Sequence, residues 1–291
     1  MAFPLDSASV AAAFVAACHA ELHALKPGNV HVHGAGHGME ISHFEAAAAA
    51  AAPFIADASL SVGARIHGAV RASFAATGLN TNLGIVLLCA PLAAAAQQRA
   101  EGTPSPLRDP LARVLSDLDQ ADAAQAFQAI VIANPAGLGQ ADAGDVHTAP
   151  TMTLREAMAL AADRDRIARA YVTVYDDIFA LGLPELHAAR RSAENESLAI
   201  TALHMSYLSA FPDSHIARKH GAAMAEAVQQ EAANMRQLWH PAPKAQTWPD
   251  LLGFDRSLKE RGLNPGTTAD LVVATLFADA LLGLGATNKP V

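Results

Sequence analysis

The sequence predicts an all-α protein, a multi-helical compact bundle. Roughly a quarter of its 291 residues are alanine, the strongest helix former. Almost every segment between turn residues has apolar positions at helical spacing, and the alternating valine, isoleucine and threonine runs that are typical of strands are missing. Aromatic residues make up only 5% of the chain, so we expect helices that pack closely through small side chains.

The first helices follow from their start and stop residues. Residues 7–25 form one helix, with Ser7 as its candidate cap and Pro27-Gly28 as its stop. A second begins at Ser42, where Ser42 and Glu45 form a capping box ahead of an alanine run. The next two are expected over residues 60–77, which Gly78 ends, and from the turn Asn80-Thr81-Asn82 to about residue 99.

The rest of the chain continues the helical pattern after a proline-containing link at 100–107. The expected helices are 110–120, 122–133, 153–162, 163–181, 185–210, 215–238, 249–261 and 268–284. The irregular stretch 134–150 is long for a loop inside a compact domain, and such loops are functional or disordered. A second link covers 240–249. We therefore predict a single all-helical domain over 1–291, and we leave open whether it has two lobes.

Composition limits the partners and the compartment. A net charge of −8 argues against a nucleic-acid partner, and an anionic substrate then needs local cations or a bound metal. Two cysteines, Cys18 and Cys89, lie in apolar helical patterns, which fits a reducing cytoplasm. The apolar runs 85–96 and 271–284 are too short to cross a bilayer, so we expect buried core helices and no membrane. A homo-oligomer is left open.

Three polar islands interrupt the apolar pattern. They are Lys26-Pro27-Gly28-Asn29-Val30-His31, Asn80-Thr81-Asn82-Leu83-Gly84 and Asn264-Pro265-Gly266-Thr267-Thr268-Ala269-Asp270. Each combines a helix breaker with side chains that cap helices or bind anions. Helix starts expose unpaired N–H groups and partial positive charge, so turns of this kind can receive phosphates. The islands therefore predict a polar cleft formed by helix ends, while three ordinary capped turns remain the alternative.

Histidines and carboxylates are the other candidate groups. Six histidines fall between residues 19 and 43, but the usual zinc spacings are absent, so phosphate donors or solvated side chains are favoured over zinc. Asp176 and Asp177 are adjacent on a helix and point in different directions. Asp270 lies in the first turn of the last helix, where it either compensates the helix dipole or binds Mg²⁺ together with substrate phosphates.

Taken in order, these motifs resemble the triphosphoribosyl-dephospho-CoA synthase family (ATP:dephospho-CoA triphosphoribosyltransferases), in its Lys-Pro-Gly-Asn-Val-His branch. The resemblance covers most of the chain. The matching pieces are Glu21 with Lys26-Pro27-Gly28, then Asn80-Thr81-Asn82-Leu83-Gly84, Asp213-Ser214-His215-Ile216-Ala217-Arg218-Lys219-His220-Gly221 and Asn264-Pro265-Gly266-Thr267-Thr268-Ala269-Asp270-Leu271.

The resemblance implies an all-helical enzyme that cleaves the N-glycosidic bond of ATP, releases adenine and joins the triphosphoribosyl group to the 2′-hydroxyl of 3′-dephospho-CoA. On this basis we expect Glu21 to be the base and Asp270 to be catalytic, with Asp213 and Asp270 holding Mg²⁺. The expected substrate and phosphate contacts are Lys26, Gly28, Asn29, His31, His37, Asn80, Thr81, Asn82, Arg218, Lys219, Gly266, Thr267 and Thr268.

The chain departs from family members that serve citrate lyase and malonate decarboxylase. Those members read Pro-Lys-Pro-Gly-Leu-Val-Asp and then Gly-Ala-His-x-Asp-Met, whereas this chain has Asn29-Val30-His31 and His37-Gly38-Met39. The family's Asn-Thr-His-x-Gly form is Asn80-Thr81-Asn82-Leu83-Gly84 here. An acidic group and a histidine are therefore missing from the expected places. We therefore expect adenine release to be slow with 3′-dephospho-CoA and faster with another hydroxyl acceptor.

Two other functions stay open at this point. One is a phosphoribosyl or pentosyl transfer to a different acceptor in the biosynthesis of one-carbon coenzymes. The other is a helical nucleotide-binding protein without turnover, because a shared fold does not fix function. Adenine release from ATP separates the binding protein from the two transferases, and dependence on the acceptor separates the transferases from each other.

Overall fold

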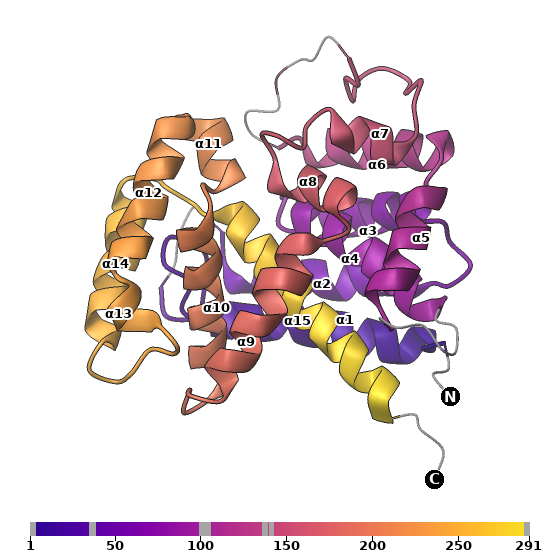
Figure 1. Cartoon of the computed structure of the whole chain (residues 1–291). Coiled ribbons are helices and arrows are strands. Elements are labelled where there is room, and N and C mark those ends of the chain that lie inside the picture. Colours follow the sequence, from indigo (N-terminus) through magenta and orange to yellow (C-terminus); the bar gives the residue numbers. More distant parts are fainter. Residues whose placement is uncertain (1–3, 35–38, 99–105, 136–138, 140–142, 288–291) are drawn as a thin grey trace. The chain divides into compact units, whose positions relative to one another are not determined.

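The computed structural model describes residues 4–34, 39–98, 106–135, 139 and 143–287 (Figure 1). Within these ranges the chain forms fifteen α-helices and one π-helix. β-Structure among the described residues is limited to one isolated bridge between His31 and Gly34. The prediction of an all-α fold is confirmed.

The chain divides into two compact units. Unit 1 comprises residues 1–17, 43–176 and 276–291, and unit 2 comprises residues 18–42 and 177–275. The division between them falls inside the first and the last long helix of the chain. That the whole chain acts as one domain, with links near 100–107 and 240–249, stays a prediction.

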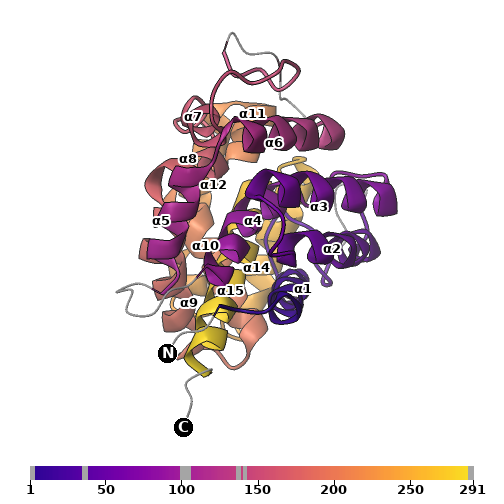
Figure 2. The ribbon, with the colours of Figure 1, turned by 90° about the vertical axis from the view of Figure 1, so that its right-hand side faces the viewer.

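Unit 1 is built around alanine-rich helices. Its elements, whole or in part, are α1 (Ser7–His23), α2 (Ile41–Ala56), α3 (Val62–Thr77), α4 (Leu83–Gln97), α5 (Arg108–Asp117), α6 (Gln120–Ala133), α7 (Leu154–Ala159), α8 (Arg166–Thr173) and the end of α15 (Gly266–Thr287). Helices α3 and α6 pack side by side (Figure 2). The buried Asp122 joins them, because its carboxylate accepts hydrogen bonds from the Gly63 amide at 2.7 Å and the Ser61 hydroxyl at 2.7 Å.

Two tyrosines repair the backbone of α4 where proline interrupts it. Pro91 has no N–H group, so the Leu87 carbonyl lacks its usual partner one turn later. The Tyr171 hydroxyl donates to the Leu87 carbonyl at 2.7 Å, and the Tyr175 hydroxyl donates to the Leu88 carbonyl at 3.1 Å. The apolar α4 can therefore stay buried although it contains a proline.

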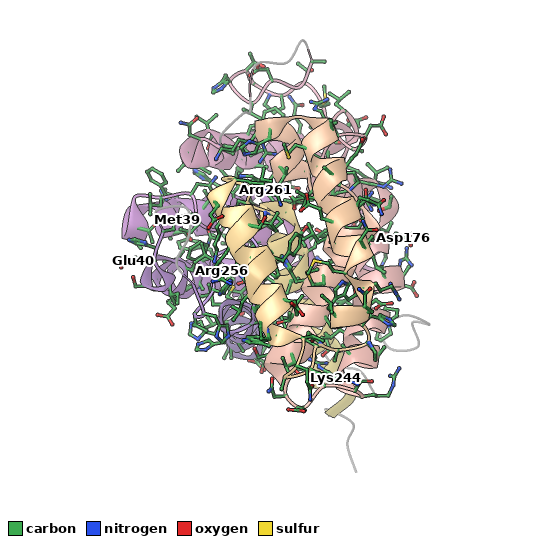
Figure 3. The ribbon with its side chains drawn as sticks, turned by 90° about the vertical axis from the view of Figure 1, so that its left-hand side faces the viewer. Met39, Glu40, Asp176, Lys244, Arg256 and Arg261 are labelled. Atoms are coloured by element: carbon green, nitrogen blue, oxygen red, sulfur yellow. The ribbon has the colours of Figure 1, made fainter. Side chains whose placement is uncertain are left out.

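Unit 2 contains the remaining elements and its own core. They are the end of α1, η1 (Asp177–Gly182), α9 (Leu183–Arg190), α10 (Glu196–Ala210), α11 (Ser214–His220), α12 (Ala222–Asn234), α13 (Arg236–Trp239), α14 (Trp248–Glu260) and the start of α15. Trp239 is fully buried in the core and donates to the Ala232 carbonyl at 3.0 Å. At the surface, Arg261 forms a two-pronged ion pair with Glu231 that joins the end of α14 to α12 (Figure 3).

Three expected long helices are broken, so those boundaries were wrong. The segment 163–181 divides at Val174 and Tyr175, which have φ values of 53° and 56° and deliver the Tyr175 hydroxyl to α4. The segment 185–210 divides before Asn195, whose side chain caps α10. The segment 215–238 divides first at Gly221, with a φ of 92°. In each case a cap or tertiary contact outweighs helix propensity.

The last helix is longer than the predicted 268–284. Over Gly266–Ala286, α15 is the one helix among the described residues that is long and apolar enough to cross a membrane. However, 56% of that window is buried inside the protein, as in a core helix.

Candidate functional site

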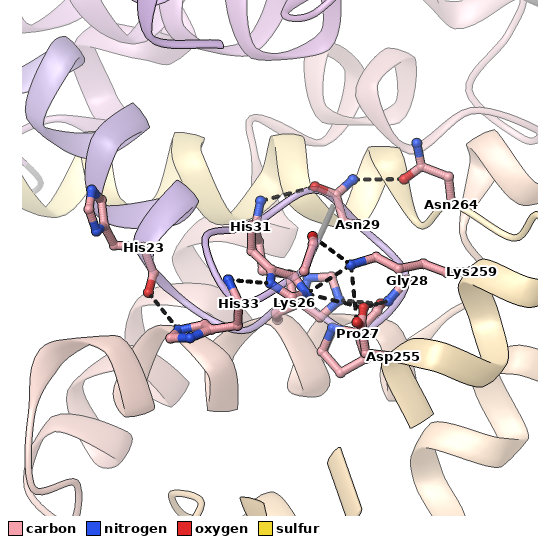
Figure 4. Close-up of polar contacts among 12 residues, drawn as sticks. His23, Lys26, Pro27, Gly28, Asn29, His31, His33, Asp255, Lys259 and Asn264 are labelled. Carbon is pink, nitrogen blue, oxygen red and sulfur yellow. Dashed lines mark hydrogen bonds and ion pairs between the residues drawn. The ribbon is translucent and has the colours of Figure 1, made fainter. Parts of the chain in front are cut away.

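Two of the polar islands, 26–31 and 264–270, are distant in sequence and meet in unit 2 (Figure 4). The side-chain amide of Asn29 donates to the side-chain oxygen of Asn264 at 2.7 Å, which joins the first island to the last. A Cβ atom on Gly28 would lie 2.8 Å from Cδ of Pro265, so these two turns pack directly on each other. The segment 213–221, which also carries the family resemblance, reaches the island 264–270 through Asp213 and Thr268. Separate capped turns would not need to meet in this way.

Residues 26–29 form a type II turn. The backbone amide of Asn29 donates to the Lys26 carbonyl at 2.9 Å. Pro27 fixes a negative φ at the first central position, and Gly28 has a φ of +84° at the second, which is the combination that defines type II. Gly28 is needed here both for its positive φ and for its close contact with Pro265.

A buried ion pair lies under this turn. The Lys26 ammonium donates to Glu21 and, at 2.9 Å, to the Asn29 side-chain oxygen. Lys26 is 0% exposed and Glu21 is 4% exposed. Burial lowers the pKa of Lys26, against the opposing charges of Glu21 and Asp270, and burial raises the pKa of Glu21, against the charge of Lys26. Both shifts favour the uncharged forms, so burial works against the charges that hold this pair together.

The sequence analysis missed Asp255 and Lys259, which anchor the first island from α14. Asp255 accepts hydrogen bonds from the Gly28 amide at 2.8 Å and Lys259 at 3.0 Å, and His31 Nε2 lies 3.1 Å from its carboxylate. Although burial raises it, the hydrogen bonds from His31 and the Gly28 amide hold the pKa of Asp255 below its ordinary value. An Asp–Lys pair four residues apart on a helix was the available sequence signal.

His31 faces this anchor. Its Nδ1 accepts a hydrogen bond from the His33 amide at 3.1 Å, so its proton is on Nε2, the atom that faces Asp255. His31 is 1% exposed, and burial lowers its pKa against the opposing charge of Asp255. His31 therefore holds the loop as a neutral ring. His37, another expected contact, lies outside the described residues.

Asp213 joins two helix starts. One carboxylate oxygen accepts from the Ile216 amide at 3.0 Å and caps α11, and the other accepts from the amide and the hydroxyl of Thr268, each at 2.8 Å, at the start of α15. Asp213 is 1% exposed. A carboxylate whose two oxygens both accept from the protein is a poor ligand for a metal ion, so this arrangement favours a structural role for Asp213.

The other expected ligand contacts of unit 2 lie in α11 and at the start of α15, and they differ in exposure. Arg218 and Asp270 are half-buried, Lys219 is exposed, and Thr267 and Thr268 are buried. A Cβ atom on Gly266 would lie 3.0 Å from Nδ1 of His215, so a side chain there would crowd that ring. Asp270 is close enough to raise the pKa of Lys26. Asp270 is thus the residue at the start of α15 whose charge acts on the first island.

The remaining island, 80–84, belongs to unit 1. Asn80 accepts from the Leu83 amide at 3.3 Å at the start of α4, and Asn82 donates to the Ser73 hydroxyl at 2.9 Å. The Thr81 hydroxyl is buried and has no hydrogen-bond partner among the described residues. Buried polar groups are nearly always paired, so this hydroxyl is a candidate ligand contact.

The described residues contain no group of three or more histidine, cysteine, aspartate or glutamate side chains that could hold a metal ion by themselves.

Comparison with known proteins identifies relatives over most of the chain. The profile of the ATP:dephospho-CoA triphosphoribosyl transferase family matches residues 7–288. No curated protein matches significantly. Among solved structures, a protein from Archaeoglobus fulgidus that is provisionally assigned as a triphosphoribosyl-dephospho-CoA synthase is 23% identical, with a TM-score of 0.60. The match covers 80% of this chain and 96% of that one, and at this identity it shows a shared fold.

Proposed function

The chain belongs to the ATP:dephospho-CoA triphosphoribosyl transferase family, and we propose that the site in unit 2 performs the transfer. In this reaction the N-glycosidic bond of ATP breaks and adenine leaves. The triphosphoribosyl group is joined to a hydroxyl oxygen of 3′-dephospho-CoA, and the proton that this hydroxyl gives up ends on the departing adenine. The observation that carries the proposal is that the islands 26–31 and 264–270 meet beside the buried Lys26–Glu21 pair, with the segment 213–221 joined to the second of them.

The chemistry sets the requirements of the site. Loss of adenine from ribose passes through a transition state with oxocarbenium character, as in glycoside cleavage. The protein must hold the triphosphate, stabilise the leaving adenine and accept the proton of the attacking hydroxyl. Holding donor and acceptor together also removes much of the entropic barrier.

We assign the triphosphate to the start of α15 and the basic end of α11. Gly266 and Thr267 lie in the first turn of a long helix, where the helix dipole favours anions. The amide and the hydroxyl of Thr268 already donate to Asp213, so we assign Thr268 to the support of this turn rather than to a phosphate. Arg218 and Lys219 lie in the last turn of α11. The net charge of the chain is −8, so these local cations must attract ATP against the overall field.

We assign the base to Glu21, working as a pair with Lys26. Burial raises the pKa of Glu21, and a carboxylate with a raised pKa is a better base near neutral pH. The ammonium of Lys26 balances the charge of the Glu21 carboxylate until Glu21 takes the hydroxyl proton and becomes neutral. The Asn29 contact to Lys26 fixes the geometry of the pair.

We assign Mg²⁺ to Asp270 and the phosphates rather than to Asp213. Asp213 is 1% exposed and both of its oxygens accept hydrogen bonds from the protein, and Asp270 is the more exposed of the two carboxylates, half-buried at the start of α15. When bound, the ion would neutralise phosphate charge. Independently, in unit 1, we propose that Asn80, Thr81 and Asn82 contact ribose or phosphate, a role supported by the unpaired Thr81 hydroxyl.

The departure at His31 no longer argues for a different acceptor. Both ring nitrogens of His31 face groups of the protein, His33 and Asp255, so the ring does not add an imidazole to an acceptor site. We therefore propose dephospho-CoA as the acceptor. The prediction from the sequence, that turnover is faster with another hydroxyl compound, is the competing hypothesis, and a comparison of the two acceptors decides between them. A cytoplasmic location, where both substrates are made, completes the proposal.

A matched pair of variants tests the triphosphate assignment. Arg218→Gln removes a half-buried cation at the end of α11, and Arg256→Gln removes an exposed one on α14. We expect the KM for ATP to rise roughly tenfold in the first variant, because one charge-assisted contact is lost, and to stay unchanged in the second. Equal effects in both variants would assign the change to net charge and contradict the site.

A further inference from the structure

The central peptide of the Lys26–Asn29 turn is held on both sides. In a turn with proline at its first central position, types I and II differ by a flip of the peptide between the two central residues. Here that peptide is formed by the Pro27 carbonyl and the Gly28 amide. The Gly28 amide donates to Asp255 at 2.8 Å, which fixes one side.

His204 fixes the other side. It projects from α10 and is 0% exposed, and its Nε2 lies 3.4 Å from the Pro27 carbonyl oxygen. A carbonyl can only accept, so Nε2 must carry the proton and donate. The Nδ1 atom has no hydrogen-bond partner among the described residues. The Pro27 contact is thus the single polar contact that the structure gives this ring.

The ring stays neutral in this position. Burial and the nearby charge of Lys26 lower the pKa of His204 to about 3. A charged ring would add a second buried cation beside Lys26. Near neutral pH, His204 is therefore uncharged and does not act as an acid or base. Its contribution to the site is the hydrogen bond to Pro27.

We propose that His204 is a positioning residue that, with Asp255, locks the Pro27–Gly28 peptide in the type II orientation. A flip to type I would turn the Gly28 amide away from Asp255 and change where Lys26 and Asn29 point. The lock therefore sets the geometry of the Lys26–Glu21–Asn29 cluster. Its consequence for turnover rests on the proposed function, whereas the lock itself does not.

Two amide variants test the lock with little change in polarity. His204→Gln places an amide nitrogen near the position of Nε2 and can still donate to Pro27. His204→Asn ends near Nδ1 and cannot reach it. Because Nδ1 has no partner, the glutamine variant loses no other contact. Hydrogen exchange of the Gly28 amide, followed by NMR in protein labelled with ¹⁵N-glycine, reports the turn directly, and kcat and KM for ATP report the site.

We expect the Gly28 amide to exchange roughly tenfold faster in His204→Asn than in wild type, and within about threefold of wild type in His204→Gln. We expect kcat to follow the same order, with KM for ATP nearly unchanged. Unchanged Gly28 exchange in His204→Asn would overturn the lock. Equal losses of kcat in both variants, together with faster exchange of glycines throughout unit 2, would also overturn the lock, because that pattern indicates general destabilisation. If exchange changes as expected but wild type releases no adenine, the proposed function fails and the lock stands.

Discussion

Replacing Lys26 with methionine tests whether the Lys26–Glu21 pair is a coupled buried unit. Lys26→Met leaves Glu21 at 4% exposure with no cation beside it. The carboxylate can escape by taking a proton, which from its ordinary pKa of 4.5 costs about 3.4 kcal/mol at pH 7. Glu21→Gln leaves the ammonium buried, and its deprotonation from an ordinary pKa of 10.5 costs about 4.8 kcal/mol at pH 7. These values set the scale for the two single variants.

The double variant, Lys26→Met with Glu21→Gln, should be far less destabilised than the sum of the two. Replacing both members of a buried pair is often neutral, whereas breaking one costs roughly 3–5 kcal/mol. Urea unfolding at pH 7, followed by circular dichroism of the helical signal, gives the three free energies of unfolding. We expect a coupling energy of at least about 2 kcal/mol from the cycle.

The pH dependence supplies a second check with a fixed sign. In Lys26→Met the folded pKa of Glu21 is raised above its unfolded value, so the folded state binds more protons and stability recovers as the pH falls from 7 toward 5. In Glu21→Gln the folded pKa of Lys26 is lowered, so stability recovers as the pH rises toward 10. Additive single variants, or stabilities that do not respond to pH in these directions, would refute the coupled pair.

Three further predictions follow from particular contacts. Gly28→Ala should lower the free energy of unfolding in urea by roughly 2–4 kcal/mol, because it adds a clash to a positive φ. Gly78→Ala, at a position with a φ of +68° and nothing within 4 Å, should lower it by only about 1 kcal/mol. Equal losses in the two variants would contradict the packing argument. Asp270→Asn should raise the Mg²⁺ concentration needed for half-maximal turnover several-fold while stability stays within about 1 kcal/mol, and an unchanged Mg²⁺ dependence would remove Asp270 from the metal site. For His204, the pKa of about 3 in the folded state means that the unfolded state binds more protons below pH 6.5. Acidification to pH 4 should therefore destabilise wild type by about 3 kcal/mol more than His204→Gln, as measured by urea unfolding, and parallel pH profiles would contradict this.

The fold class was predictable because alanine-rich, helix-spaced segments leave few alternatives, but three helix boundaries depended on tertiary contacts. Tyr175 leaves helical geometry and donates to a carbonyl of α4, and no local pattern announces a partner 87 residues away. Gly221, which divides another helix, is permissive in many helices and decisive only in context.

The candidate site was predictable in part for a similar reason. The islands mark themselves through helix breakers and capping residues, so their positions could be read from the sequence. Their partners could not. Asp255 meets Gly28 across 227 positions, and His204 meets Pro27 across 177. His204 lies inside an apolar helical pattern and resembles an ordinary core residue until its single contact is seen. The roles of Asp213 and His31 also depend on which donors and acceptors face them.

The most direct test of the central claim is adenine release from ATP with 3′-dephospho-CoA as the sole acceptor, followed by chromatography. Wild type and the Lys26→Met, Glu21→Gln double variant should be compared, because the double variant is expected to stay folded. We predict that wild type releases one adenine for each dephospho-CoA consumed, and that the double variant loses this activity while remaining helical. No acceptor-dependent adenine from wild type, or undiminished release from the folded double variant, would contradict the account.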